Sequence, residues 1–398
     1  MTAIRTLPEN PTQLLPRSAY VDDQWLARER AELFGKTWSF AGVVSDFTKP
    51  GDYRTYQVGN YPLVVLMDRD GDLRAFHNIC RHRGTELLEG SGNAGSKLVC
   101  PYHLWVYNLD GALKGVPAKS ECFPDLDVKS VRLMSASIGF FKGLIFIHPS
   151  ADPDESFDEW LASVPDHVWP HDLDSTDLQE FGFEVVYEMK CNWKVFFENA
   201  IDGYHLAYLH KHTLGGPVAD QNVWDAHGRH LLWYSTERDG QRHPLPQFLE
   251  KNIEKYGQKK VKAAKGETFA GVYMLFPTTI ITPSPYSFTI STLEPVDANT
   301  TRLRARSWQP KGMFSYREKI TDIPGYDKES GLIKSSHWKV HPLETGDFQT
   351  EDVWVCEKMQ RAMQSPAYQV GGLAKGAGAE APLAFFQQLV LDYVPLES

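Results

Sequence analysis

Two short cysteine–histidine pairs are the residues of this chain best suited to hold a metal. One residue separates Cys80 from His82, and two residues separate Cys100 from His103. Thiolate sulfur and imidazole nitrogen are both metal ligands, and each pair supplies one of each. The pattern predicts a compact metal centre held between two neighbouring loops.

Two kinds of centre suit this donor set. Tetrahedral zinc accepts two cysteines and two histidines, but zinc modules usually pair cysteine with cysteine and histidine with histidine. In a Rieske [2Fe–2S] cluster, two histidines replace two cysteines on one of the irons. The mixed pairs favour the Rieske cluster, with zinc as the alternative. The runs CRHRG from residue 80 and CPYHLWVYNLDG from residue 100 resemble the paired signatures of Rieske proteins.

A second set of candidate ligands lies in the run ENAIDGYHLAYLH, residues 198–210. Asn192 is placed to cap a helix that carries this run. His205 and His210, with one carboxylate, would form the facial triad of non-haem Fe(II) oxygenases. A spacing of five residues takes His210 off the helical face of His205, so the helix must bend or widen between them. His212 is the nearest rival of His210.

Together, the two motifs resemble the oxygenase component of Rieske non-haem iron oxygenases, the ring-hydroxylating α-subunit family, over nearly the whole chain. The resemblance implies that Asp202 links the cluster of one subunit to the iron of the next in a head-to-tail homotrimer, and that Asn199 lies beside the iron. It also selects Asp352 as the carboxylate ligand, because the family has an acidic pair at the start of a late helix. Glu351 and Asp347 remain competing ligands, and the acidic pair would also stabilise a helix N-terminus through its dipole alone. The implied ligands are Cys80, His82, Cys100 and His103 for the [2Fe–2S] cluster, and His205, His210 and Asp352 for the mononuclear Fe(II).

The composition restricts the partners and the compartment. The formal charge of -10, from 41 basic and 51 acidic residues, argues against nucleic acid or an anionic membrane as a partner. The N-terminus lacks the apolar core of a signal peptide. Five cysteines are too few for a disulfide framework, so a cytoplasmic location is expected. The chain shows no GxGxxG after a strand, so a separate NAD(P)H-dependent reductase or a ferredoxin has to deliver the electrons.

Length and hydropathy patterning predict an α+β fold with two to three domains. We expect an N-terminal helical segment, 1–38, which packs on the catalytic domain, and a small antiparallel β Rieske domain, 39–155, with hairpin turns that end at Gly71 and Gly111. A catalytic domain, 156–398, is expected to contain an antiparallel sheet flanked by helices, of the helix-grip type. The extended segments expected in it are 181–189, 271–281, 288–293 and 301–308, the last two paired across a turn; the polar segments 237–268 and 371–381 are predicted to be solvated surface.

The predicted reaction is hydroxylation of a small organic molecule by O₂. An aromatic acid or a similar ring compound is the first substrate expected. The alternative is oxidation of an N-methyl group, because the chain length and the run EDVWVCEKMQ also resemble glycine-betaine and stachydrine demethylases. Trp224, Trp233 and Tyr234 are candidates for an aromatic cage around a quaternary cation. An electron carrier without oxygenase activity and a zinc-stabilised binding module are the competing classes of protein.

Overall fold

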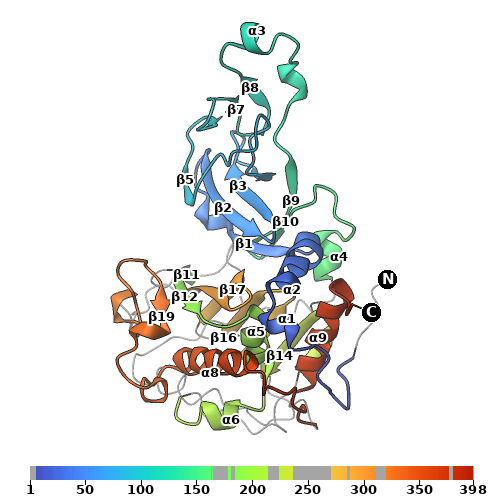
Figure 1. Cartoon of the computed structure of the whole chain (residues 1–398). Coiled ribbons are helices and arrows are strands. Elements are labelled where there is room, and N and C mark those ends of the chain that lie inside the picture. Colours follow the sequence, from blue (N-terminus) through green and yellow to red (C-terminus); the bar gives the residue numbers. More distant parts are fainter. Residues whose placement is uncertain are drawn as a thin grey trace. The chain divides into compact units, whose positions relative to one another are not determined.

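The computed structural model describes residues 6–162, 164, 178–180, 184–213, 224–235, 270–284, 287–310, 320–375 and 380–397. The chain divides into two compact units, residues 28–162 and residues 1–27 together with 163–398. Both units contain antiparallel sheets, and the longest helices belong to the second, so the predicted α+β fold is confirmed (Figure 1). The predicted surface segment 237–268 lies outside the described residues, as do the side chains of Trp224, Trp233 and Tyr234.

The unit of residues 28–162 is an antiparallel β domain. Its described strands form one sheet in the order β1-β10-β9-β4-β3-β2-β5 and a smaller sheet in the order β6-β7-β8. The strands are β1 Ser39–Val43, β2 Asp52–Val58, β3 Tyr61–Met67, β4 Leu73–His77, β5 Ser91–Asn93, β6 Leu98–Val99, β7 Val106–Tyr107, β8 Leu113–Gly115, β9 Ser135–Phe141 and β10 Leu144–His148, with two short helices, α3 Lys119–Cys122 and α4 Phe157–Leu161.

The central strand β3 is apolar on both of its faces. Leu63 and Val65 belong to one buried cluster, whereas Val64 and Leu66 belong to a second cluster, which also contains the cysteines of the two ligand loops. Successive side chains of a strand point to opposite faces, so a nearly continuous apolar run fills both cores. This packing places the ligand loops on a sheet that is buried on both sides.

Both predicted hairpin turns are present in this unit. Gly71 ends the turn between β3 and β4, and Gly111 ends the turn between β7 and β8. Their φ values are 89° and 84°, a left-handed conformation that glycine adopts without steric cost. The second turn is closed by a hydrogen bond of 3.0 Å from Gly111 N to Asn108 O.

The second unit contains a larger sheet in the order β13-β14-β15-β16-β17-β18-β12-β19, with β11 paired to β18. Its pairings are antiparallel except that of β12 with β19. The strands are β11 Leu178–Glu180, β12 Val185–Met189, β13 Trp224–His227, β14 His230–Ser235, β15 Ala270–Leu275, β16 Thr279–Ser284, β17 Ser287–Asp297, β18 Thr300–Pro310 and β19 Ile333–Lys334.

Strands are present in the described part of each predicted segment of this sheet, with one correction; residues 181–183 lie outside the described part. β17 and β18 pair across the turn at residues 298–299. The segment 271–281 is not one strand, because the chain turns after Leu275 and returns as β16. Apolar content alone does not show such a turn, since Tyr273 and Met274 before it and Ile280 and Ile281 after it are all buried.

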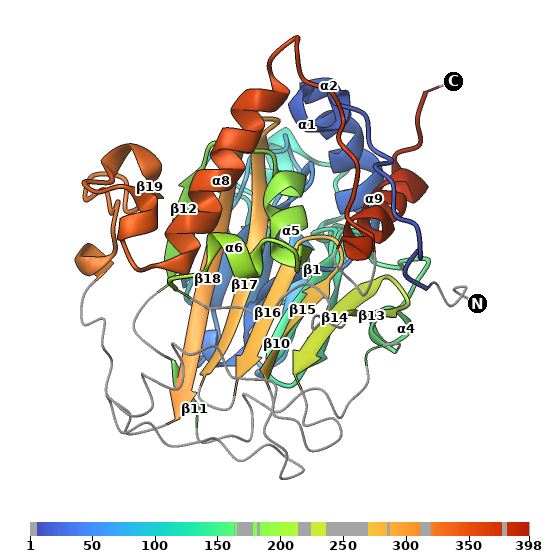
Figure 2. The ribbon, with the colours of Figure 1, turned by 90° about the horizontal axis from the view of Figure 1, so that it is seen from below.

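The helices of this unit lie over one face of the sheet (Figure 2). They are α1 Ser18–Val21, α2 Asp23–Arg28, α5 Trp193–Ile201, α6 Leu206–Leu209, α8 Phe348–Met363 and α9 Ala381–Tyr393. Apolar rings join two of them, since Phe386 of α9 stacks on Phe197 of α5 at a centroid distance of 4.4 Å and meets Trp193 edge-on at 5.6 Å. A buried sheet face and rigid helix contacts therefore support α5, which carries the second ligand motif.

Candidate metal centres

The two cysteine–histidine loops have the same backbone geometry. Cys80 N donates to Thr85 O and Cys100 N donates to Trp105 O, at 2.8 and 2.9 Å. Inside each turn, the residue four places after the cysteine donates back to its carbonyl and has a positive φ, 77° at Gly84 and 57° at Leu104. The left-handed residue closes each loop tightly, so each loop presents its cysteine and histidine together.

The four predicted cluster ligands gather between these loops. Both cysteines are buried, and the His82 and His103 rings lie 4.5 Å apart between centroids. Among the described residues, only the other motif places three ligand atoms within 4.8 Å of one another. In a Rieske cluster, one iron would take both thiolates and the other both imidazoles.

The environment of the loops also fits a metal cluster. His82 Nδ1 is buried without a hydrogen-bond partner, while its ring stacks on Trp105 at 4.9 Å. Burial, aided by the neighbouring Cys100 thiol, raises the pKa of Cys80. A buried imidazole nitrogen without a partner is costly unless a metal binds it, and the same metal would replace the protons of the two thiols. Tyr107, which the motif analysis did not single out, places its hydroxyl 3.3 Å from Cys80 Sγ.

The helix that carries the second motif is shorter than predicted. Asn192 caps α5 as expected, with its Oδ1 accepting from Lys194 N at 3.1 Å. The helix ends at Ile201 because Asp202 leaves the helical conformation, and Asp202 Oδ1 accepts from Tyr204 N at 2.6 Å. The expectation of one bent helix is therefore wrong. A capping aspartate followed by Gly203 breaks it, which propensity alone does not locate.

His205 and His210 flank the separate one-turn helix α6, and this arrangement lets both imidazoles reach one point. Their Nε2 atoms lie 3.1 Å apart. Asp352 Oδ1, from the first turns of α8, lies 2.9 Å from His210 Nε2 and 3.6 Å from His205 Nε2. Ligand atoms at right angles around one metal, with bonds of about 2.1 Å, would lie about 3 Å apart. The three residues would hold an iron ion with two imidazoles and one carboxylate, a ligand set that leaves coordination positions open for other ligands.

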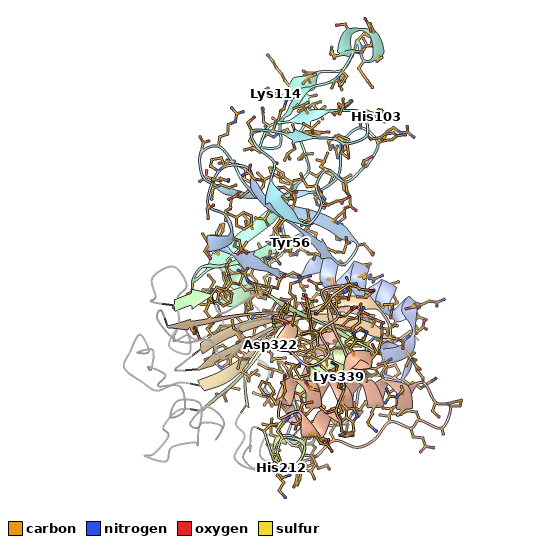
Figure 3. All side chains as sticks on the ribbon, turned by 90° about the vertical axis from the view of Figure 1, so that its left-hand side faces the viewer. Tyr56, His103, Lys114, His212, Asp322 and Lys339 are labelled. Carbon is orange, nitrogen blue, oxygen red and sulfur yellow. The ribbon has the colours of Figure 1, made fainter. Side chains whose placement is uncertain are left out.

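The competing residues occupy other places. Glu351 Oε2 lies 2.7 Å from His210 Nδ1, on the far side of the ring from the iron site, and also accepts from Thr213 Oγ1 at 2.7 Å. Asp347 caps α8, accepting from Gln349 N at 3.0 Å. His212 is exposed, whereas His210 is buried (Figure 3, where His212 is labelled). Of these residues, only Glu351 touches the site, as the outer partner of a histidine ligand.

Two further predicted residues adjoin the triad. Asn199 Nδ2 donates to Asp352 Oδ1 at 2.9 Å, so it orients the carboxylate. Asp202 Oδ2 lies 3.4 Å from His205 Nδ1. Burial alone lowers the pKa of His205, but Asp202 and Asp352 together raise it to about 10, and Asp352 likewise raises the pKa of His210. The negative potential of these carboxylates favours a protonated imidazole in the absence of a metal. The same potential favours a metal cation bound in this place.

Comparisons with known proteins agree with both centres. Residues 37–132 match the Rieske [2Fe-2S] domain family, and residues 177–396 match the family described as ring hydroxylating alpha subunit (catalytic domain). The carnitine monooxygenase oxygenase subunit of Acinetobacter baumannii is 27% identical, with 99% of this chain and all of that protein covered. The glycine betaine monooxygenase oxygenase subunit of Chromohalobacter salexigens is 33% identical over 51% of this chain, but this match spans only 44% of that relative's length.

Solved structures share the fold. A quaternary ammonium Rieske monooxygenase superposes with a TM-score of 0.71 at 24% identity and covers 98% of this chain and all of the other. Naphthalene 1,2-dioxygenase from Rhodococcus sp. gives 0.69 at 21% identity, with 96% and 95% covered. At these identities the likeness concerns the fold, while the family matches concern the sequence. The chain belongs to the ring-hydroxylating alpha-subunit family, with a Rieske [2Fe-2S] domain ahead of its catalytic domain.

Proposed function

We propose that this protein is the terminal oxygenase of a multicomponent Rieske system. The observation that carries the proposal is the convergence of His205, His210 and Asp352, in one chain with a pair of Rieske ligand loops. Bound iron at such a triad supplies open positions at which O₂ and electrons meet the substrate. A separate NAD(P)H-dependent reductase or ferredoxin would reduce the cluster, which passes on one electron at a time.

The chain's own residues have distinct parts in this proposal. Cys80 and Cys100 would hold one iron of the cluster, and His82 and His103 the other. In the mononuclear site, Asn199 holds Asp352 Oδ1 in place and Glu351 fixes the tautomer of His210 by accepting from its Nδ1. With iron bound, this outer hydrogen bond would leave the lone pair of Nε2 for the metal.

Asp202 would bridge the cluster of one subunit and the iron of the next in a head-to-tail homotrimer. Its carboxylate already lies near His205 Nδ1, on the side of the ring away from the triad. The solved quaternary ammonium Rieske monooxygenase is described in terms of inter-subunit electron transfer. We propose the same route here.

A quaternary ammonium compound is the substrate class that we propose, in place of the aromatic acid expected first. The relatives include oxygenase subunits acting on carnitine, glycine betaine and choline, the last a chloroplastic enzyme of spinach that matches 92% of this chain at 27% identity. The chain's negative formal charge also favours a cationic substrate over an anionic one. The product would be an alcohol, or a demethylated amine and formaldehyde where the carbon oxidised is an N-methyl group.

A single-turnover experiment tests this proposal. Iron-loaded, chemically reduced protein is mixed with ¹⁸O₂ and a pool of carnitine, choline, glycine betaine and aromatic acids, and the products are analysed by mass spectrometry. We expect label in one quaternary ammonium product, or formaldehyde with a demethylated amine. Label in an aromatic ring would instead identify a ring hydroxylase. The Asp352→Ala variant, with its cluster intact, should form no product, whereas a mere electron carrier would be unaffected by it.

We also propose a cytoplasmic location, on the low cysteine content of the chain. No helix in the described part of the protein is long and apolar enough to cross a bilayer.

A further inference from the structure

A cavity of about 140 Å³ lies beside α5 in the catalytic unit. Its lining comes from the N-terminal segment, α5, α8, the segment around Tyr368 and α9. The lining residues used below are Arg17, Tyr20, Glu198, Asn199, Asp202 and Glu380. A water needs about 10–15 Å³ of such space and several polar partners, so this cavity has room for several waters.

Glu198 is the most deeply buried acid of this cavity, with 5% of its surface exposed. Its Oε1 accepts from Tyr20 Oη at 2.7 Å and from Gln387 Nε2 at 3.0 Å. Neither partner is a cation, and burial raises the pKa of Glu198 to about 7. The carboxyl therefore changes charge within the range of ordinary cellular pH.

Other charged and titratable groups lie near Glu198 or line its cavity. Lys194, one turn earlier on α5 and fully buried, lowers the pKa of Glu198. Asp202 and Glu380 share the cavity, and burial raises the pKa of Glu380. Arg17 lines the cavity with its guanidinium bonded to the carbonyls of Met363 and Gln364. Burial raises the pKa of Tyr368 and of Cys356 on α8, and the charge of Glu198 adds to both shifts.

The same cavity reaches the two residues that adjoin the iron ligands. Asn199 lines it and donates to Asp352 Oδ1 at 2.9 Å. Asp202 lines it and lies 3.4 Å from His205. The cavity therefore joins the buried acid Glu198 to Asn199 and Asp202, the two residues that contact iron ligands.

We propose that Glu198 is a proton reservoir for oxygen reduction and that the cavity water carries its proton toward the iron site past Asn199 and Asp202. Hydroxylation of a C–H bond by O₂ consumes two electrons and two protons and yields one alcohol and one water. The cluster, reduced again by the separate reductase, would supply the two electrons one at a time. Glu198, reprotonated from solvent through the cavity after each transfer, would supply the two protons. This role rests on the proposed oxygenase function but not on the identity of the substrate.

The first test needs no substrate. Infrared titration of the holoenzyme follows the carbonyl stretch of protonated carboxyl groups between pH 5 and 9. In the wild type we expect a buried carboxyl that ionises near pH 7 and whose signal is absent in Glu198→Gln. The matched control is Glu357→Gln, which removes another buried carboxylate, on α8, whose Oε1 accepts from Lys190 N and Ser335 Oγ. That variant should retain the signal, and a Glu198 that is ionised throughout the range contradicts the proposal.

The second test measures turnover against pH with the cluster and iron contents of each variant matched. Because the protonated form of Glu198 is the donor, wild-type turnover should fall as the pH rises through about 7. In Glu198→Gln, turnover should no longer fall as the pH rises through about 7. It should also be about 100-fold slower than in the wild type, the effect expected when a proton donor is lost. Turnover of Glu357→Gln should fall with rising pH as that of the wild type does.

The proposal would be overturned if turnover of Glu198→Gln fell with rising pH as in the wild type. It would also be overturned if both variants lost this pH dependence. If the wild type oxidises none of the quaternary ammonium compounds, the proposed substrate fails. The infrared titration still decides the state of Glu198 in that case.

Discussion

The imidazole of His210 is held by a carboxylate on each of its ring nitrogens, Asp352 at Nε2 and Glu351 at Nδ1. Replacing Glu351 by Gln should lower iron affinity or turnover about 10–100-fold, the usual effect of losing an outer hydrogen bond to a metal ligand. Iron affinity, measured by competition with a chelator, checks this expectation.

Asp347→Asn is the matched control for that substitution. Asparagine still caps α8, so iron binding should be unchanged. Complete loss of iron from Asp347→Asn, with binding retained in Asp352→Asn, would show that the third ligand is misassigned.

Glu198 also predicts how stability depends on pH. A carboxyl whose pKa rises on folding, here from 4.5 to about 7, is protonated more readily in the folded state. The folded protein therefore loses stability as the pH rises from about 4.5 through 7, because the carboxyl ionises in the unfolded chain while burial keeps it protonated in the folded one. Glu198→Gln should remove this part of the pH dependence. Thermal unfolding midpoints of both proteins between pH 4.5 and 8 provide the measurement, and parallel curves would contradict the prediction.

Helix α8 is tied to the start of α5 by buried amides, and this contact sets the distance between the carboxylate and histidine ligands. Gln360 Oε1 accepts from Asn192 N at 3.0 Å, and its Nε2 donates to Tyr20 O at 2.9 Å. Gln360→Met would remove both hydrogen bonds and leave the buried Asn192 N–H without this acceptor, at a cost of about 1–3 kcal/mol. We expect a lower unfolding midpoint and weaker iron binding, with an unchanged cluster spectrum.

Gln364→Met is the comparison for this helix contact. Gln364 donates to Asn299 Oδ1 at an exposed site, so its loss should change stability by no more than about 0.5 kcal/mol. Equal effects of the two substitutions would argue against a special role for the buried amide.

At the scale of the whole assembly, a head-to-tail trimer predicts that two inactive variants can complement each other. Cys80→Ser lacks the cluster but keeps the triad, whereas Asp352→Ala lacks the iron but keeps the cluster. In mixed trimers, made by co-expression with different tags, the cluster of one subunit would serve the iron of the next. We expect product from mixed trimers and none from either variant alone; mixed trimers without activity would place electron transfer within one subunit.

Much of the site could be predicted because its ligands belong to short motifs. The spacings at Cys80, His82, Cys100 and His103 indicated a Rieske cluster, and the triad histidines came from one run of thirteen residues. Asn192 as a helix cap and the turns at Gly71 and Gly111 were equally local. Such features depend on the conformation of a few neighbouring residues, which the sequence itself restricts.

Only the tertiary structure decided the side-chain positions and contacts that depend on segments distant in the sequence. Asp352, Glu351 and Asp347 are close in sequence, yet one lies at the iron site, one contacts His210 Nδ1 and one caps α8. The direction of each side chain follows from the way α8 packs in the unit. The tertiary structure also broke the motif helix after Ile201 and brought Tyr20, Glu198 and Gln387 together from three parts of the chain. The sequence by itself determined which chemistry is available, since ligand types and short spacings are local properties. Packing determined which atoms take part, since burial, distance and pKa arise only when remote elements meet.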